Sequence, residues 1–180
     1  LEPEDVPAFL SEGDFDGINV TIPYKKTVIP YCAELSDRAR RIGSVNTILR
    51  RADGSLFGHN TDYDGFATLL KKIDYDPAGK KALVLGSGGS SVTVRAVLTD
   101  HRASEIVTIS RTGENNYQNL RLHADASLIV NTTPVGMYPN NGASPLSLDE
   151  FPACGAVIDI IYNPAQTRLL WDARQRGIQW

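Results

Sequence analysis

The feature that most constrains the fold is a run of small residues between an apolar segment and an amphipathic one. Residues 82–85 are apolar, residues 86–90 read Gly-Ser-Gly-Gly-Ser, and the apolar residues that follow stand at helical spacing: Val92, Ala96 and Val97. This pattern predicts a strand over 82–86, a tight turn, and a helix over 90–101.

The predicted turn has the properties of a phosphate-binding loop. Gly86 permits the sharp turn, Gly88 lets backbone N–H groups approach a pyrophosphate, and the helix that begins near Gly89 directs its positive end at the anion. Ser91 stands where the G-x-G-x-x-G pattern has its third glycine. The motif alone therefore fits both a dinucleotide site and an ordinary strand-to-helix turn.

The end of the next predicted strand indicates which dinucleotide binds. In NAD-binding domains an acidic residue about 20 positions after the glycines holds the ribose 2′-hydroxyl. Here the strand predicted over 105–110 ends in Ser110, Arg111 and Thr112, with no acid. A guanidinium and two hydroxyls would bind a 2′-phosphate, which a carboxylate would repel. We therefore expect NADP as the cofactor; the alternative is that Arg111 is a solvated surface arginine.

The second half of the chain predicts a Rossmann-type domain. Apolar runs alternate with helical patterns, which is typical of a parallel sheet covered on both faces. The expected strands are 82–86, 105–110, 127–131 and 156–161, the expected helices are 90–101 and 167–176, and a small helix is expected within 113–123.

The first half predicts a smaller, mixed α/β domain. The expected elements are an acidic helix over 4–10 closed by Gly13, a strand over 17–23, a helical run from 24 to 34, a helix over 37–42 capped by Ser36, a hairpin turning at Asp53-Gly54, and a helix over 62–73 capped by Asn60 and Thr61. Turn residues at 74–79 indicate a boundary, so we expect domains at 1–76 and 77–180.

Composition excludes several classes of protein. A net charge of −3 without a long basic run argues against nucleic acid as a partner. No apolar run approaches the roughly 20 residues that span a bilayer, so we expect no membrane partner. Cys32 and Cys154 are isolated and the three histidines are scattered. This pattern predicts no disulfide, no metal site, and a reducing, cytoplasmic location.

Seven motifs in order give the chain a resemblance to a known family. They are Asn19-Val-Thr-Ile-Pro-Tyr-Lys25, Gly43-Ser-Val-Asn-Thr47, Gly58-His-Asn-Thr-Asp62 with Gly65, Gly86-Ser-Gly-Gly-Ser90, Ser110-Arg-Thr112, Asn131-Thr-Thr-Pro-Val-Gly-Met137 and Asp159-Ile-Ile-Tyr-Asn-Pro164. With these motifs the chain resembles the shikimate dehydrogenase family. The resemblance implies a two-domain oxidoreductase of aromatic amino acid biosynthesis. Such an enzyme interconverts shikimate and 3-dehydroshikimate with NADP(H), the substrate lying between the domains.

The resemblance also implies roles for single residues. Lys25 would be the acid/base and Asp62 would orient it and the substrate; read alone, they are a solvated lysine and a helix-start charge. Thr21, Asn46 and Tyr162 match substrate-binding positions; the alternative for Tyr162 is a core aromatic at the end of a buried strand. The cofactor-binding positions that match are Asp37, Gly86, Ser87, Gly88, Gly89, Ser90, Ser110, Arg111, Thr112, Thr132, Thr133, Met137 and Ile160.

Two family segments have no counterpart here: a β-α unit with a Ser-x-Ser pair before Leu1, and a helix with a substrate-binding glutamine after Trp180. We therefore expect a portion of a longer catalytic domain. The sequence leaves open whether this portion turns over substrate or only binds nucleotide. It also leaves open whether the enzyme is a quinate/shikimate dehydrogenase that uses NAD, and whether it is a homodimer.

Overall fold

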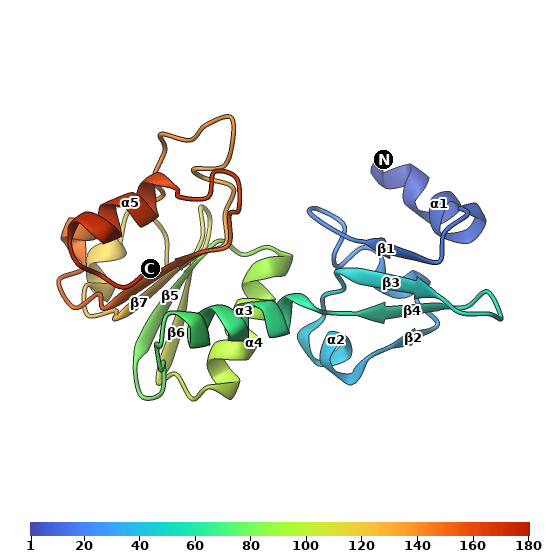
Figure 1. Cartoon of the computed structure of the whole chain (residues 1–180), viewed down its shortest axis with the longest axis horizontal. Helices are drawn as coiled ribbons and strands as arrows, with labels where there is room; N and C mark the ends of the chain where they lie inside the picture. Colours follow the sequence, from blue (N-terminus) through green and yellow to red (C-terminus); the bar gives the residue numbers. More distant parts are fainter. The chain divides into compact units, whose positions relative to one another are not determined.

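The computed structural model describes residues 1–180 and divides into two compact units, Leu1–Gly65 and Phe66–Trp180 (Figure 1). Each unit holds one four-stranded sheet. The prediction of an α/β protein with a Rossmann-type sheet is confirmed. The units divide within helix α3 (Asp62–Lys72), upstream of residue 76, and the domain boundary after residue 76 stays a prediction. None of the helices combines the length and the apolar character that crossing a membrane requires.

The first unit is built on a mixed sheet of order β1-β3-β4-β2, in which β2 runs parallel to β4 and the other pairs are antiparallel. Its buried core includes Val45, Ile48 and Leu56. In chain order the elements are η1 (Pro3–Asp5), α1 (Val6–Glu12), β1 (Gly17–Asn19), η2 (Ile29–Tyr31), β2 (Glu34–Leu35), α2 (Asp37–Ile42), β3 (Thr47–Arg50) and β4 (Leu56–His59), followed by the start of α3.

Local signals predicted most of this unit. The Ser36 hydroxyl accepts the Ala39 N–H at 3.1 Å, and Gly43 ends α2 with φ of 68°. The predicted helical run over 24–34 is wrong: the segment forms turns, η2 and the short strand β2. One reason is that the Lys25 carbonyl accepts the Val45 N–H at 2.8 Å, a bond outside any helix. In addition, Pro30 has no N–H to donate within a helix.

The second unit is built on an all-parallel sheet of order β6-β5-β7-β8. Its elements are β5 (Lys81–Leu85), α4 (Gly89–Asp100), β6 (Glu105–Ile109), η3 (Leu120–His123), β7 (Leu128–Asn131), η4 (Leu148–Glu150), β8 (Ala156–Asp159) and α5 (Arg168–Gln175). The central strands β5 and β7 are buried nearly throughout, as their continuous apolar sequences require. Helix α4 packs on β5 and β6, and α5 packs on β8.

The strands β5 and β7 are neighbours at the centre of the sheet, with β6 added beside β5 and β8 added beside β7. Their carboxyl ends form the place where ligands bind in open parallel sheets. The backbone is crowded here: a Cβ on Gly86 would lie 2.9 Å from Thr132 Oγ1 and 3.0 Å from Thr133 Cγ2. Gly86 also has φ of 104°, which side chains disfavour. Gly88, by contrast, has φ of −79°, and a Cβ added there would have no other atom within 4 Å.

The contrast between these glycines gives a first prediction. Gly86→Ala should lower the free energy of unfolding by roughly 2 kcal/mol or more, because it adds backbone strain and a clash with Thr132. Gly88→Ala is the control and should stay within about 0.5 kcal/mol of the parent chain. Urea unfolding followed by tryptophan fluorescence measures this unit alone, since both tryptophans, Trp171 and Trp180, belong to it. Equal stability of the two variants would contradict the account.

The buried thiol of Cys154 gives a second prediction. Burial raises the pKa of Cys154 to about 11 from an ordinary value of 9.0. Between these pH values the unfolded chain loses the thiol proton and the folded chain keeps it, so stability falls as pH rises. The loss should reach up to about 3 kcal/mol. Urea titrations at a series of alkaline pH values should show a steeper fall for the parent chain than for Cys154→Ala; parallel curves would refute the assignment.

Candidate functional site

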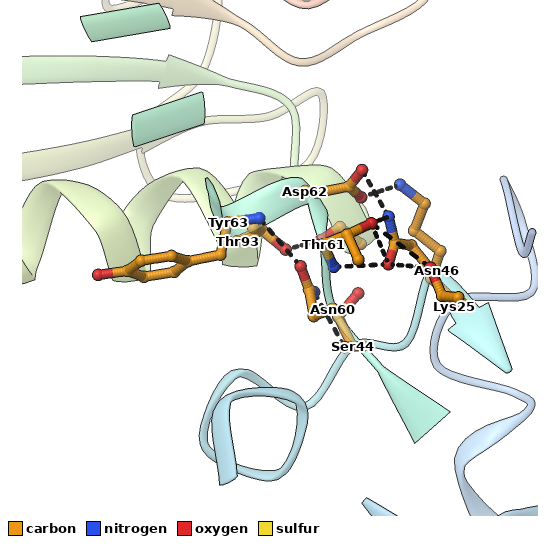
Figure 2. A network of polar contacts seen from close by, with 10 residues as sticks. Lys25, Ser44, Asn46, Asn60, Thr61, Asp62, Tyr63 and Thr93 are labelled. Atoms are coloured by element: carbon orange, nitrogen blue, oxygen red, sulfur yellow. Dashed lines mark hydrogen bonds and ion pairs between the residues drawn. The ribbon is translucent and has the colours of Figure 1, made fainter. Parts of the chain in front are cut away.

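Lys25 and Asp62 form an ion pair in the first unit, with 2.6 Å between Lys25 Nζ and Asp62 Oδ2 (Figure 2). Lys25 lies in the turns that follow β1, and its side chain is only 11% exposed, whereas that of Asp62 is 36% exposed. Asp62 is the first residue of α3, where a negative charge is favoured by the helix dipole. The pair therefore combines a shielded ammonium with a carboxylate that solvent and ligands can still reach.

Asn46 fixes the other side of this carboxylate. Its Nδ2 donates to Asp62 Oδ1 and to Thr61 Oγ1, each at 2.8 Å. Its Oδ1 accepts the Thr61 N–H at 2.8 Å and the Thr47 hydroxyl at 3.0 Å. Figure 2 shows the Asn46 and Asp62 side chains converging from the start of β3 and the start of α3. Both carboxylate oxygens of Asp62 are thus held, one by a cation and one by an amide.

A second asparagine, Asn60, holds the backbone next to this network. Asn60 donates from Nδ2 to the Ser44 carbonyl at 2.9 Å, and its Oδ1 accepts the Tyr63 N–H at 3.2 Å, which confirms Asn60 as a cap of α3. The Asn60 N–H in turn donates to His59 Nδ1 at 2.8 Å. These bonds join the end of β4 to the start of α3, so the position of Asp62 is determined by the sheet.

Thr61 belongs to the same network, although the sequence predicts only a helix cap at this position. It bonds Asn46 through both its backbone and its hydroxyl. Thr21, which was expected to bind substrate, is exposed after β1, and its carbonyl accepts the Tyr24 N–H at 2.9 Å. Tyr162 lies in the second unit, in the loop after β8, and is 89% exposed, so it is not a core aromatic.

The predicted phosphate loop, residues 86–90, has the backbone of an anion-binding turn. It joins β5 to α4, whose 12 residues begin at Gly89 with Gly88 as an N-cap that offers no side-chain hydrogen bond. Ser87 and Gly88 are exposed, and the space beside Gly88 is open. Backbone N–H groups at a helix start can bind a phosphate that approaches this closely.

Arg111 follows β6 and is exposed, as is its neighbour Thr112. The Ser110 N–H donates to the Asn115 carbonyl at 3.1 Å, which folds the loop back on itself. Burial raises the pKa of the Tyr117 phenol, and the nearby Arg111 guanidinium opposes that shift. The exposed guanidinium of Arg111 is accessible to an anion.

The loop after β7 is anchored to the end of β5 and to the end of β7 itself. Thr132 is buried, and its hydroxyl donates to the Leu85 carbonyl at 2.6 Å. The Thr133 hydroxyl donates to Asn131 Oδ1 at 2.7 Å. Met137, further along the loop, is 43% exposed. Ile160 is half-buried after β8, and its N–H donates to the Asn131 carbonyl at 3.2 Å.

Two aspartates lie outside the groups described so far. Asp37, expected to line the cofactor, is the first residue of α2 in the first unit, and no hydrogen bond there joins it to the Lys25 network. Asp159 had been noted only as the first letter of a motif. Burial raises its pKa, although hydrogen bonds from Ile161, Asn131 and Thr167 oppose the shift. The structure contains no group of three or more His, Cys, Asp or Glu side chains placed to hold a metal ion.

Comparison with known proteins identifies relatives for both units. Residues 2–48 match the family model described as the shikimate dehydrogenase substrate binding domain. The chain is 39% identical over 166 residues to the shikimate dehydrogenase (NADP(+)) of Clostridium beijerinckii, covering 86% of this chain and 61% of that protein. It is 37% identical to the corresponding protein of a Geobacillus species, covering 98% of this chain and 72% of the relative.

A solved structure of a shikimate dehydrogenase also resembles this chain. The shikimate 5-dehydrogenase of Thermus thermophilus, in complex with NADP(H) and shikimate, superposes with a TM-score of 0.83 at 35% identity. The match covers 98% of this chain and 70% of that one. The chain thus spans about three fifths of the Clostridium relative's length. From the identity, the coverage and the shared fold together, the chain belongs to the shikimate dehydrogenase family.

Proposed function

We propose that this chain carries the catalytic pair and the cofactor loop of an NADP-dependent shikimate dehydrogenase, which interconverts shikimate and 3-dehydroshikimate. The observation that carries the proposal is the Lys25–Asp62 pair, 2.6 Å apart and held by Asn46. A relative of the same fold binds shikimate and NADP(H). The reaction belongs to aromatic amino acid biosynthesis.

The pair can move the proton that this reaction requires. Reduction of a ketone places a hydride on carbon and a proton on oxygen, and the Lys25 ammonium would supply that proton. In the reverse direction the neutral amine takes the proton of the hydroxyl. Asp62 holds Nζ in place through both directions, and Asn46 keeps the carboxylate turned toward it. Bound NADP would supply the hydride chemistry.

The residues of the second unit fit NADP. Position 86 requires glycine because of its backbone conformation and its contact with Thr132, and the open side of Gly88 leaves room for a pyrophosphate. Ser110, Arg111 and Thr112 would bind the 2′-phosphate. The rest of the cofactor would lie along the loops that hold Thr132, Thr133, Met137 and Ile160. An NAD-dependent quinate/shikimate dehydrogenase is less well supported, because no acid stands where NAD would need one.

Two further expectations belong to the proposal. The substrates are small molecules, and we place the protein in the cytoplasm because Cys32 and Cys154 are free thiols, as a reducing compartment favours. A homodimer stays a prediction.

Two adjacent lysines provide a matched test of the catalytic role. Lys25→Ala should lower the rate of NADPH formation from shikimate by roughly 10²- to 10⁴-fold, because the proton acceptor is lost. Lys26→Ala removes an exposed lysine and should leave the rate within about twofold of the parent chain. Absorbance at the NADPH band measures both.

The outcomes separate the alternatives. Equal rates for the two variants would remove Lys25 from the reaction. If the parent chain binds NADP without forming NADPH, the chain is a nucleotide-binding portion and turnover needs segments beyond it. If it binds neither NADP nor NAD, the proposal fails as a whole.

Arg111 should determine the choice of dinucleotide. Loss of a charged hydrogen bond to phosphate costs about 1.5–3 kcal/mol, so Arg111→Ala should weaken NADP binding roughly 10- to 100-fold and leave NAD binding unchanged. Arg95→Ala, which removes an exposed arginine from α4, is the control. Calorimetric titration with each dinucleotide measures the ratio. Equal losses for NADP and NAD would show that Arg111 does not contact the 2′-phosphate.

A further inference from the structure

Asp159 is a partly buried carboxylate to which the proposed reaction assigns no role. It is the last residue of β8, and its two oxygens accept hydrogen bonds from three groups. Asn131 Nδ2 donates to both oxygens at 3.1 Å, the Ile161 N–H donates to Oδ1 at 3.0 Å, and the Thr167 hydroxyl donates to Oδ2 at 2.8 Å. All of these donors are neutral.

One arm of this network reaches the loop after β7. Asn131 lies opposite Asp159 in the strand register and is fully buried. While its Nδ2 is held by Asp159, its Oδ1 accepts the Thr133 N–H at 3.0 Å and the Thr133 hydroxyl at 2.7 Å. An asparagine amide can point only one way at a time. The Asp159 carboxylate, together with the Val135 carbonyl, which also accepts from Nδ2 at 3.3 Å, therefore determines which atom of Asn131 faces Thr133.

The other arms reach the loop after β8. The Ile161 N–H is bonded to Asp159 immediately before Tyr162, and the Asn163 carbonyl accepts the Tyr138 N–H at 3.0 Å, which joins the two loops. Thr167 is the buried N-cap of α5, and its hydroxyl also accepts the Leu170 N–H. One carboxylate thus holds the starts of two loops and the start of a helix.

Both loops carry large side chains that are exposed. Met137 is 43% exposed, Tyr138 is 64% exposed and Tyr162 is 89% exposed. Such side chains contribute little to a core, so holding their backbone in one arrangement has a use mainly in binding. Polar networks that are fully satisfied can specify a single arrangement of the groups around them.

We infer that Asp159 is a positioning residue. Through Asn131 it sets Thr133, and through the Ile161 N–H it sets Tyr162, so that the loops after β7 and β8 are ordered before cofactor and substrate arrive. The inference rests on the proposed function for its kinetic consequence, but its structural part can be tested without ligand.

Hydrogen exchange of the ligand-free chain is the first test. In Asp159→Asn the new amide nitrogen cannot accept a hydrogen bond. Whichever oxygen it replaces, it faces Asn131 Nδ2 and one further donor, either the Ile161 N–H or the Thr167 hydroxyl, and the bonds on that side are lost. Exchange of the amides in residues 132–138 and 160–163 should rise about tenfold or more, while that in 86–92 stays unchanged. Asp172→Asn, which breaks the surface pair of α5 with Arg168, is the control and should change neither loop.

Kinetics is the second test. Asp159→Asn should lower kcat for shikimate oxidation roughly 10- to 100-fold, because a displacement of about 1 Å at a binding group is enough for such a loss. The Kd for NADP should rise by a smaller factor than kcat falls, since the loop over residues 86–90 and Arg111, which are not held by Asp159, would keep their contacts with the cofactor. The double variant Asn131→Asp with Asp159→Asn exchanges the two side chains and again places an amide beside a carboxylate. On a logarithmic scale, it should recover at least half of the kcat that Asp159→Asn loses.

The possible outcomes are distinct. Unchanged exchange in both loops overturns the inference. Faster exchange with kcat unaltered overturns the positioning role, and so does an equal loss in kcat and NADP affinity, which indicates general destabilisation. A parent chain without turnover bears on the proposed function alone; the exchange data then still decide whether Asp159 orders the two loops.

Discussion

The close approach of Gly86 to Thr132 and Thr133 is the contact on which the second unit depends. Two parallel strands that are neighbours in the sheet leave its edge at this point, and the chain must turn sharply after each. A residue without a side chain lets β5 pass into α4 directly beside the loop after β7. The Thr132 hydroxyl donates to the Leu85 carbonyl and so bonds the loop after β7 to the end of β5. The geometry of the turn over residues 86–90 therefore depends on the loop after β7.

The first unit reaches its geometry by a different means. Here an asparagine amide, which can donate and accept at once, joins the start of a strand to the start of a helix. Asn46 holds Asp62 with one end and Thr61 with the other. Because the carboxylate is held by a neutral group as well as by Lys25, its orientation does not depend on the charge of the lysine. That independence suits a lysine whose proton is exchanged during a reaction.

The parts of the fold that follow from local chemistry could be predicted from the sequence. The cap at Ser36, the hairpin turn and the strand-turn-helix at Gly86 depend on residues that are close in the chain. The segment 24–34 could not be predicted in this way, because its backbone bonds to Val45, far along the sequence. The same holds for the pairing of Asn131 with Asp159: it depends on the register of two strands, which periodicity does not determine.

The network around Asp159 also differs from Arg111 in a way that affects how the protein responds to its solution. Attraction between a guanidinium and a phosphate weakens as salt screens the charges, whereas hydrogen bonds from neutral donors inside the protein are screened much less. In the proposed complex, Arg111 would hold the adenosine end of the cofactor through charge, whereas hydrogen bonds inside the protein would order the loops at the other end. Ionic strength would loosen the adenosine end first while the opposite end keeps its arrangement, and the chain would lose its preference between dinucleotides before it loses the ordered loops.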